Sequence, residues 1–205
     1  SKKYNDSDFQ KEAKEIVEST KGLKMILSID RLDYTKGIPE RIKSFGRFLR
    51  KYPEYRGKVR LNLIVAPSRV ALDSYDELRK EITELVSEVN GKYGTVSWMP
   101  IWFFFQSFTQ ESLIAFYRNS DVLLVTPLRD GMNLVVKEYI ASRTDYDGMV
   151  VISETAGAAS ELGEAVVVNA NDYDAIASGI KTALEMPHDD KAARNKVMHN
   201  RIKRY

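Results

Sequence analysis

The sequence predicts an α/β fold, a doubly wound parallel sheet of about six strands with helices on both faces. Short runs of Val, Ile and Leu alternate along the chain with longer amphipathic segments. These runs are almost continuously apolar, which is typical of strands buried on both faces of a parallel sheet. The 205 residues suffice for one Rossmann-like domain with a buried core, so we predict a single domain over residues 1–205.

Hydrophobic periodicity places the elements of the first half of the chain. The period is close to 3.6 residues in the helical segments, and the strand segments are short apolar runs. Pro39 near the start of the second helix and Pro53 beyond its end suit helix boundaries, and Asn90-Gly91 is expected to end the third. The predicted elements are helix 8–19, strand 25–29, helix 37–52, strand 59–66, helix 72–89 and strand 95–98.

The second half continues the alternation and ends in two consecutive helices. The cluster Trp102 to Phe105 follows the third predicted strand, and we interpret it as core packing or a domain interface. The closing segment is rich in Lys and Arg. The predicted elements are helix 110–118, strand 121–126, helix 132–142, strand 149–153, helix 156–162, strand 165–168, and helices 173–184 and 190–205.

Composition excludes several classes of function. A net charge of +2 argues against nucleic acid or an anionic membrane as partner, and no apolar run approaches the roughly 20 residues of a membrane span. The absence of cysteine excludes disulfides and thiolate metal sites. His188 and His199 have no metal-like partner nearby in sequence, so we expect no metal and no cofactor. Without a signal peptide, a cytoplasmic location is the default expectation.

In such sheets ligands bind beyond the carboxyl ends of the strands, and the loop after the first strand carries two cations there. Arg31 and Lys36 stand five residues apart, just before a helix. A guanidinium fork, a point charge and free amides at a helix start suit a diphosphate. The alternative is a solvated loop in which these charges pair with Asp30 and Asp33.

The loop after strand 121–126 leads into a helix that carries Glu138. Gly131 permits close approach of a ligand, and the amides of residues 132–135 would favour an anion or a sugar. Asp130 and Glu138 are eight residues apart and suit sugar hydroxyls as acceptors. The alternative is that Asp130 only caps the helix and Glu138 lies on a solvated face.

Two further loops remain ambiguous on local evidence. Arg69 follows the second strand and could bind a phosphate. The alternative, an ordinary surface arginine, is favoured by the local sequence. The small-residue turn 153–159 allows either a ligand or another backbone to approach closely. No P-loop and no GxGxxG dinucleotide motif is present in the sequence.

Taken together, these segments resemble the trehalose-6-phosphate synthase family, retaining glycosyltransferases of the GT-B architecture. RDGMNLV with its trailing KEY is very specific, and RLDYTKG ahead of it makes chance agreement implausible. The similarity covers only the carboxyl-terminal domain of that family. The matching stretches are RLDYTKGIPERI (31–42), PSR (67–69), NGKYGTV (90–96), SDVLLVTPLRDGMNLVVKEYIA (120–141) and SETAGAASEL (153–162).

The resemblance implies a role for each matching position. Arg31 and Lys36 would hold the donor diphosphate and stabilise it as it leaves, without a metal. Asp130 would be the carboxylate that binds glucose hydroxyls. The remaining implied positions are the amides of Gly131, Met132 and Asn133 for glucose, the amides of Leu134 and Val135 for the phosphate and ribose, Glu138 for the ribose hydroxyls, Phe108 and Leu113 for uracil, and Arg69 for the phosphate of glucose 6-phosphate.

The implied reaction transfers glucose from a nucleoside diphosphate glucose, UDP-glucose in the first instance, to glucose 6-phosphate with retention. The amino-terminal GT-B domain lies outside the match, so we expect weak donor binding and little turnover from this chain alone. The helix 190–205 is expected to pack toward that domain. A glucosylglycerol-phosphate synthase-like enzyme, a non-catalytic nucleotide-sugar-binding module and a structural α/β domain remain alternatives, as do the donor base and a homo-oligomeric state.

Overall fold

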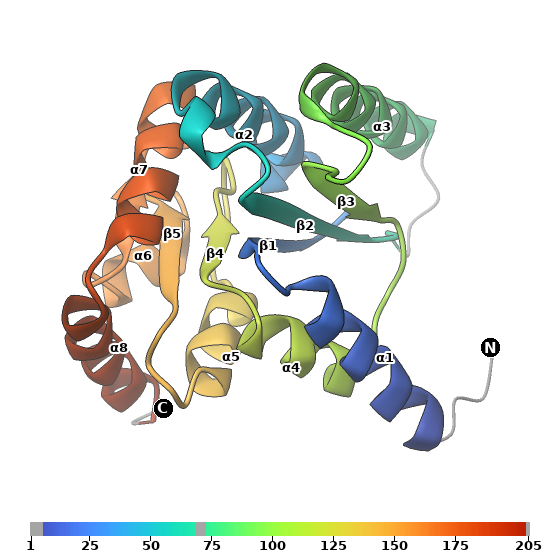
Figure 1. Ribbon diagram of the computed structural model, residues 1–205. Coiled ribbons are helices and arrows are strands. Elements are labelled where there is room, and N and C mark those ends of the chain that lie inside the picture. Colours follow the sequence, from blue (N-terminus) through green and yellow to red (C-terminus); the bar gives the residue numbers. More distant parts are fainter. Residues whose placement is uncertain (1–5, 69–72, 204–205) are drawn as a thin grey trace.

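The computed structural model describes residues 6–68 and 73–203 and contains one parallel sheet with helices on both faces (Figure 1). Its six strands lie in the order β3-β2-β1-β4-β5-β6. The order runs outward from β1 in one direction and from β4 in the other, which defines a doubly wound sheet. The predicted fold class and strand number are confirmed.

The strands are short and almost wholly buried, and the helices between them are longer. The strands are β1 (Lys24–Arg31), β2 (Val59–Ala66), β3 (Ile101–Phe104), β4 (Val122–Val125), β5 (Met149–Ser153) and β6 (Val166–Val168). The helices are α1 (Asp6–Ser19), α2 (Ile38–Lys51), α3 (Asp73–Tyr93), α4 (Gln110–Arg118), α5 (Leu134–Ser142), α6 (Gly157–Glu161), α7 (Tyr173–Glu185) and α8 (His188–Ile202), with 3-10 turns η1 (Tyr34–Lys36) and η2 (Pro53–Tyr55).

The helices form a layer on each side of the sheet. Helices α2, α3 and α7 pack together on one face, whereas α1, α4 and α5 line the other and α8 packs against α5 (Figure 1). The core is one apolar cluster that reaches from β2 and β1 through β4 and β5. Burial of this surface at about 25 cal/mol per Å² is the main source of stability, which explains why the strands read as continuous Val/Ile/Leu runs.

The strand order fixes where a ligand can lie. Strand β1 pairs with β2 along its full length and with β4 at Ile26–Val122 and Leu27–Leu123. The chain winds away from this β1–β4 boundary in opposite directions, so the loops beyond these two strands diverge and leave a crevice. Those are the loops that carry Arg31 with Lys36, and Asp130.

The predicted strand at residues 95–98 is wrong. Thr95 and Trp98 instead close a tight turn, in which the Thr95 amide donates to the Trp98 carbonyl at 2.8 Å and Val96 is fully exposed. The third strand is Ile101–Phe104, and its aromatic residues are the ones that the sequence presents as a packing cluster. Aromatic residues favour strands, and at this edge position their side chains are half-buried rather than core residues.

The predicted helix break at Asn90-Gly91 is also wrong, because α3 continues to Tyr93. The Asn90 side chain binds both main-chain groups of Ile101, donating to its carbonyl at 3.0 Å and accepting from its amide at 2.9 Å. The turn signal is outweighed by this tertiary contact, which fixes α3 against the start of β3. The NGKYG segment is therefore a helix end that positions an edge strand.

The other predicted elements are present, with boundaries shifted by at most three residues. The last helix begins at His188 rather than at 190, and residues 204–205 lie outside the described part. Its contact with another region of a longer protein stays a prediction. None of the described helices is long and apolar enough to cross a membrane.

Candidate functional site

Lys36 and Asp130, which are 94 residues apart in sequence, form an ion pair at the carboxyl edge of the sheet. The Lys36 Nζ lies 2.8 Å from Asp130 Oδ2, and their side chains are 14% and 12% exposed. Lys36 ends the 3-10 turn after β1, and Asp130 stands in the loop after β4. The structure thus brings together the two residues that the sequence places in separate loops.

The loop before Lys36 is shaped by an aspartate cap and a left-handed glycine. Asp33 caps η1 by accepting from the amide and the hydroxyl of Thr35, at 2.8 and 2.7 Å. Gly37 has φ +62° at the junction with α2, and a Cβ there would lie 2.7 Å from the Thr126 carbonyl oxygen. Only glycine can both adopt this φ and fit against the Thr126 carbonyl. The backbone conformation at Gly37 therefore places Lys36 beside the end of β4.

The alternative in which Arg31 and Lys36 pair with Asp30 and Asp33 is wrong at the level of contacts. Asp30 is buried against Arg41, and Asp33 is engaged by Thr35. Burial acts to raise the pKa of Asp33, but the two Thr35 hydrogen bonds and the charges of Lys36 and Arg31 outweigh it and lower that pKa.

Arg31 is exposed at the end of β1. Within residues 6–68 and 73–203, no hydrogen bond or ion pair joins its guanidinium to another side chain. Its guanidinium fork is therefore available at the same edge as the Lys36 ammonium. The Lys36 ammonium, held in a pair, and the Arg31 guanidinium, open to solvent, are two cations that a diphosphate could bridge.

Asn133, rather than Asp130, caps the helix after β4. Its side chain accepts from the Val136 amide at 3.2 Å, so α5 begins at Leu134 and the capping alternative for Asp130 is wrong. The Asn133 amide group also donates to Asp130 Oδ2 at 3.1 Å. The first-turn amides of Leu134 and Val135 have no intrahelical acceptor. Met132 precedes the helix and is exposed, so the predicted helix start at 132 is two residues early.

The small-residue turn after β5 packs its backbone directly against the Asp130 loop. The Gly157 amide donates to the Asp130 carbonyl at 2.8 Å, and the Asp130 amide donates to the Thr155 carbonyl at 3.3 Å. A Cβ on Gly157 would lie 2.1 Å from the Gly131 carbonyl oxygen. The close approach that the sequence left open is thus between two backbones.

Glu138 lies about one turn into α5, and a tyrosine hydroxyl binds its carboxylate. The Tyr117 hydroxyl donates to Glu138 Oε2 at 2.8 Å. Burial, followed by the Glu138 carboxylate, raises the pKa of Tyr117, so this hydroxyl stays protonated and remains a donor. Glu138 itself is exposed and keeps acceptor capacity toward solvent. Tyr117 was not identified from the sequence, because a buried tyrosine in an apolar helix carries no distinguishing pattern.

Phe108 and Leu113 sit at the start of α4, beyond β3. The Phe108 ring packs edge-on against Phe104 and Phe116, with centroids 5.6 and 5.2 Å away, and it borders a cavity of about 290 Å³ between α1, β3 and α4. Leu113 is half-buried against the core. The Phe108 side chain packs in this cluster, and contact of its main chain with a base stays a prediction.

Arg69 and metal independence stay predictions, as do the ligand contacts of the other site residues. Arg69 lies outside the described residues, as does the rest of the 69–72 segment. Within residues 6–68 and 73–203, no group of three or more His, Asp or Glu side chains is placed to hold a metal ion. Metal independence stays a prediction.

Arg41 is the principal site residue that the sequence reasoning missed. It is fully buried in α2, and its guanidinium reaches Asp30, Thr126 and the main chain of Lys36. A signal was present, because Arg41 falls on the apolar face of α2, three residues after Ile38 and four before Phe45. A charge on a buried helical face needs a partner, and that partner lies at the site.

Comparison with known proteins identifies the relatives of this chain. The model of glycosyltransferase family 20 matches residues 1–205. A bifunctional trehalose-6-phosphate synthase/phosphatase of Thermoproteus tenax is 44% identical over 180 residues, which are 88% of this chain and 25% of that protein. The trehalose-6-phosphate synthase of Cronobacter sakazakii is 44% identical over 177 residues, 86% of this chain and 37% of that protein.

Solved structures agree with the sequence relatives. An E. coli structure with bound UDP-2-fluoro glucose aligns with a TM-score of 0.90 at 37% identity, over 97% of this chain and 46% of that one. The UDP-forming α,α-trehalose-phosphate synthase of Burkholderia xenovorans in complex with glucose-6-phosphate aligns with a TM-score of 0.89 at 36% identity, over 96% and 45%.

The chain thus spans less than half the length of these relatives, and the part it matches is their carboxyl-terminal domain. The six-stranded Rossmann-like sheet is the one found in GT-B trehalose-phosphate synthases. The chain belongs to glycosyltransferase family 20, within which it is similar to the trehalose-6-phosphate synthases.

Proposed function

We propose that this chain is the donor-binding part of a retaining glycosyltransferase that moves glucose from UDP-glucose to glucose 6-phosphate and forms trehalose 6-phosphate. One observation carries the proposal. A lysine and a carboxylate from two distant loops meet at the β1–β4 switch point, beside an exposed arginine and an open helix start. Charged groups of both signs at this point suit a ligand with a phosphate end and a hydroxyl-rich end.

Arg31 and Lys36 would bind the diphosphate end. As the bond between the sugar and the diphosphate breaks, negative charge grows on the leaving phosphate oxygens. Two oriented cations stabilise that charge in a closed cleft, where the interaction is stronger than in water. The acceptor hydroxyl bonds to the same face of the sugar carbon, and its proton passes to the leaving phosphate. We propose that this step needs no metal ion.

Asp130 and the start of α5 would bind the sugar end. The Asp130 carboxylate has acceptor capacity beyond its bonds to Lys36 and Asn133, and glucose hydroxyls are donors. The amides from Gly131 to Val135 would complete the contacts with the sugar, phosphate and ribose. Glu138, oriented by Tyr117, would accept from the ribose hydroxyls. The main chain at Phe108, with Leu113 beside it, would contact the base.

The acceptor and the remaining half of the active site would come from outside this chain. Related structures contain UDP-2-fluoro glucose in one case and glucose-6-phosphate in another, which supports these two substrates here. Arg69 would contact the phosphate of glucose 6-phosphate. The amino-terminal domain of the same enzyme would close the cleft, and we propose that the enzyme works in the cytoplasm.

Calorimetric titration of this chain with UDP, GDP and ADP tests the donor site. We expect UDP to bind most tightly, and the double variant Arg31→Ala/Lys36→Ala to lose at least about tenfold in affinity per cation removed. The control is Arg50→Ala/Lys80→Ala, which removes the same charge from exposed positions on α2 and α3. Preference for GDP or ADP would contradict the donor assignment, and no binding at millimolar concentration would contradict a donor site formed by this chain alone.

Mixing this chain with the amino-terminal region of a family relative separates an enzyme from a binding module. Release of UDP that depends on both parts and on glucose 6-phosphate is the expected result. Nucleotide binding without turnover in the complete assembly would favour a non-catalytic module.

A further inference from the structure

Arg41 is a fully buried cation whose donors are all directed at the candidate site. Its Nη1 group donates to Asp30 Oδ2 and to the Ser28 hydroxyl, each at 2.6 Å, and its Nε donates to the Thr126 hydroxyl at 3.1 Å. The remaining Nη2 group donates to the main-chain carbonyl of Lys36 at 2.9 Å. One guanidinium therefore joins α2, β1, the end of β4 and the Lys36 turn.

Stability alone does not account for this arrangement. Removing two charges from water is costly, and apolar groups of similar volume are often at least as stabilising as a buried ion pair. The pair between Arg41 and Asp30 is 0% and 4% exposed. Burial raises the pKa of Asp30 against the opposing charge of Arg41, which shows how unfavourable the environment is for a lone carboxylate.

The contacts around Arg41 connect the Lys36 loop to the Asp130 loop. The Thr35 carbonyl accepts from the amides of Leu128 and Arg129, at 2.8 and 3.2 Å. Arg41 adds a side-chain link at the base of the same contact, since it holds the Lys36 carbonyl on one side and Thr126 on the other. The two loops are consequently held as one unit, with the Lys36 main chain fixed relative to the loop that carries Asp130.

We propose that Arg41, neutralised by Asp30, is a positioning residue that sets the place of Lys36 relative to Asp130 for donor binding. This inference rests on the proposed function. Arg41 is fully buried, so it would act through the Lys36 main chain rather than by contact with the ligand. A displacement of about 1 Å at a group that binds the reacting phosphate can cost about 100-fold in rate, so positioning of this kind has a measurable effect.

The variant Arg41→Lys keeps the charge but loses the planar fork that reaches four acceptors at once. We expect UDP affinity to fall about tenfold or more, at a temperature well below unfolding. The matched control is Arg143→Lys, which alters a buried arginine at the opposite edge of the sheet. We expect this control to lose stability while its UDP affinity is unchanged. Equal losses of affinity in both variants would overturn the proposal.

A double-mutant cycle with Lys36→Ala distinguishes positioning from general weakening. If Arg41 acts through Lys36, Arg41→Lys should cost little further affinity once the Lys36 side chain is gone. Losses that multiply in the double variant would overturn the proposal. Thr126→Val is a milder variant that removes one acceptor of Arg41 at nearly constant volume, and it serves where Arg41→Lys does not fold.

Amide hydrogen exchange gives a readout that needs no nucleotide. Arg41→Lys should accelerate exchange at Leu128 and Arg129, whose acceptor is the Thr35 carbonyl, more than at Leu27 in the sheet centre. Uniform acceleration, or no change at Leu128 and Arg129, would overturn the proposal. If the unaltered chain binds no UDP, a donor site formed by this chain alone is ruled out, and the exchange pattern still decides the role of Arg41.

Discussion

The two ends of the parallel strands, the carboxyl edge and the amino edge of the sheet, each carry a network of charged side chains. The two networks differ in the kind of group that their charged side chains bind. At the carboxyl edge, Lys36 and Asp130 meet through side chains alone. At the amino edge, Arg143 donates to the main-chain carbonyls of Arg118, Ser120 and Asp147, as well as to the Asp145 carboxylate. The first network joins two side chains that can exchange partners, whereas the second binds acceptors that belong to the fold.

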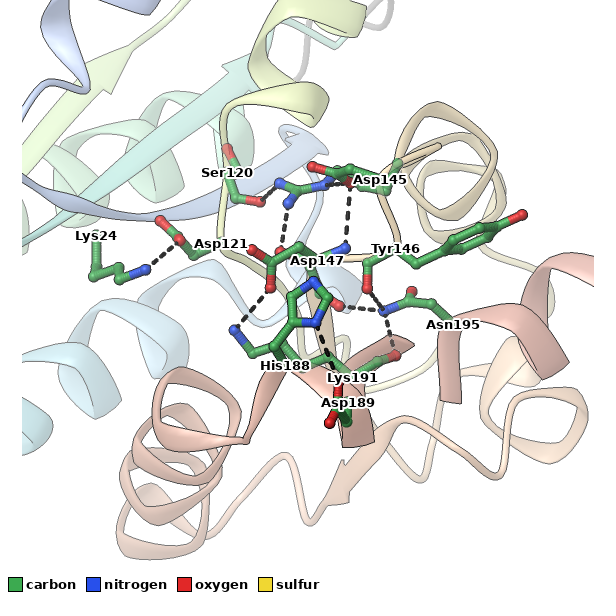
Figure 2. A network of polar contacts seen from close by, with 12 residues as sticks. Lys24, Ser120, Asp121, Asp145, Tyr146, Asp147, His188, Asp189, Lys191 and Asn195 are labelled. Atoms are coloured by element: carbon green, nitrogen blue, oxygen red, sulfur yellow. Dashed lines mark hydrogen bonds and ion pairs between the residues drawn. The ribbon is translucent and has the colours of Figure 1, made fainter. Parts of the chain in front are cut away.

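The amino-edge network also seats the last helix. Asn195 of α8 donates to the carbonyls of Tyr146 and Gly148, and Lys191 lies 3.4 Å from the Asp147 carboxylate (Figure 2). Tyr146 has φ +57°, a strained conformation for a residue with a side chain, and these contacts hold it. The inner face of α8 is therefore occupied within this domain.

The comparison distinguishes polar and charged side chains that stabilise the fold from charged side chains that are available to a ligand. Arg143 and Asn195 are buried with partners supplied mainly by backbone, so removing them leaves fixed acceptors unsatisfied. Lys36 and Asp130 retain some exposure, and beside them Arg31 is open to solvent. Exchangeable partners at a crevice suit ligand binding, and fixed partners suit folding.

Arg143→Ala is expected to have the largest effect. The buried Ser120 carbonyl and its neighbours would lose a charged donor, so we expect the free energy of unfolding to fall by about 2–4 kcal/mol. UDP affinity should be unchanged, because the carboxyl edge lies at the other end of the strands. Denaturant unfolding measures the first quantity and calorimetry the second.

The variant Lys36→Ala tests the same difference between the two networks from the carboxyl edge. We expect a loss of stability of about 1 kcal/mol or less and a large loss of UDP affinity. A stable Arg143→Ala variant, or one whose nucleotide affinity falls in proportion to its stability, would remove the distinction between the two edges.

Much of the fold could be predicted from the sequence because its strands are buried on both faces. Five of the six strands stand out as apolar runs, for instance residues 122–125 and 149–153. The exception is β3, an edge strand of half-buried aromatic residues, for which the apolar pattern does not distinguish strand from cluster. Asn90 was misjudged because a local turn signal does not reveal a partner 11 residues away.

Less of the site could be predicted. The loops were placed correctly because parallel strands bring their carboxyl ends to one edge. The pairing of Lys36 with Asp130, and the fact that Asn133 rather than Asp130 caps α5, depend on side-chain geometry that spacing does not contain. Arg41 could have been found from its position on an apolar helical face, but its partners could not.

Asp130→Asn is expected to have an intermediate effect, in an unusual direction. The free diphosphate of UDP must compete with the Asp130 carboxylate for Lys36, and that carboxylate repels it. The amide variant frees Lys36, so we expect UDP to bind several-fold to about tenfold more tightly. UDP-glucose should gain less, because its hydroxyls lose a charged acceptor. Calorimetry with both ligands measures the ratio.

Asp145→Asn is the matched control for that variant, since it removes a carboxylate from the amino-edge network and should alter neither affinity. Weaker UDP binding by Asp130→Asn would mean that the carboxylate orients Lys36 toward the phosphate rather than competing with it. This result would contradict the view that partners at the carboxyl edge are exchangeable.

The smallest effect is expected from the ion pair that fastens α8 near β6. Arg201 donates to both oxygens of Glu164, at 2.7 and 2.9 Å, and these hydrogen bonds lower the pKa of that carboxyl from 4.5. Because the folded-state pKa lies below the unfolded-state value, the stabilisation is complete above that value and is lost as pH falls through the folded-state value. Both side chains are partly exposed, so the contribution is about 1 kcal/mol or less.

Arg201→Gln should therefore reduce the free energy of unfolding near neutral pH and leave it almost unchanged at a pH below both pKa values. The pH dependence of unfolding for the variant would be flatter than that of the unaltered chain across this window. Arg194→Gln is the control, because Arg194 donates to the Glu164 main-chain carbonyl and acts on the carboxylate only through its charge, more weakly than Arg201. An equal loss of stability for Arg201→Gln at all pH values would show that Arg201 acts through packing and main-chain contacts, such as its bond to the Glu161 carbonyl, rather than through charge.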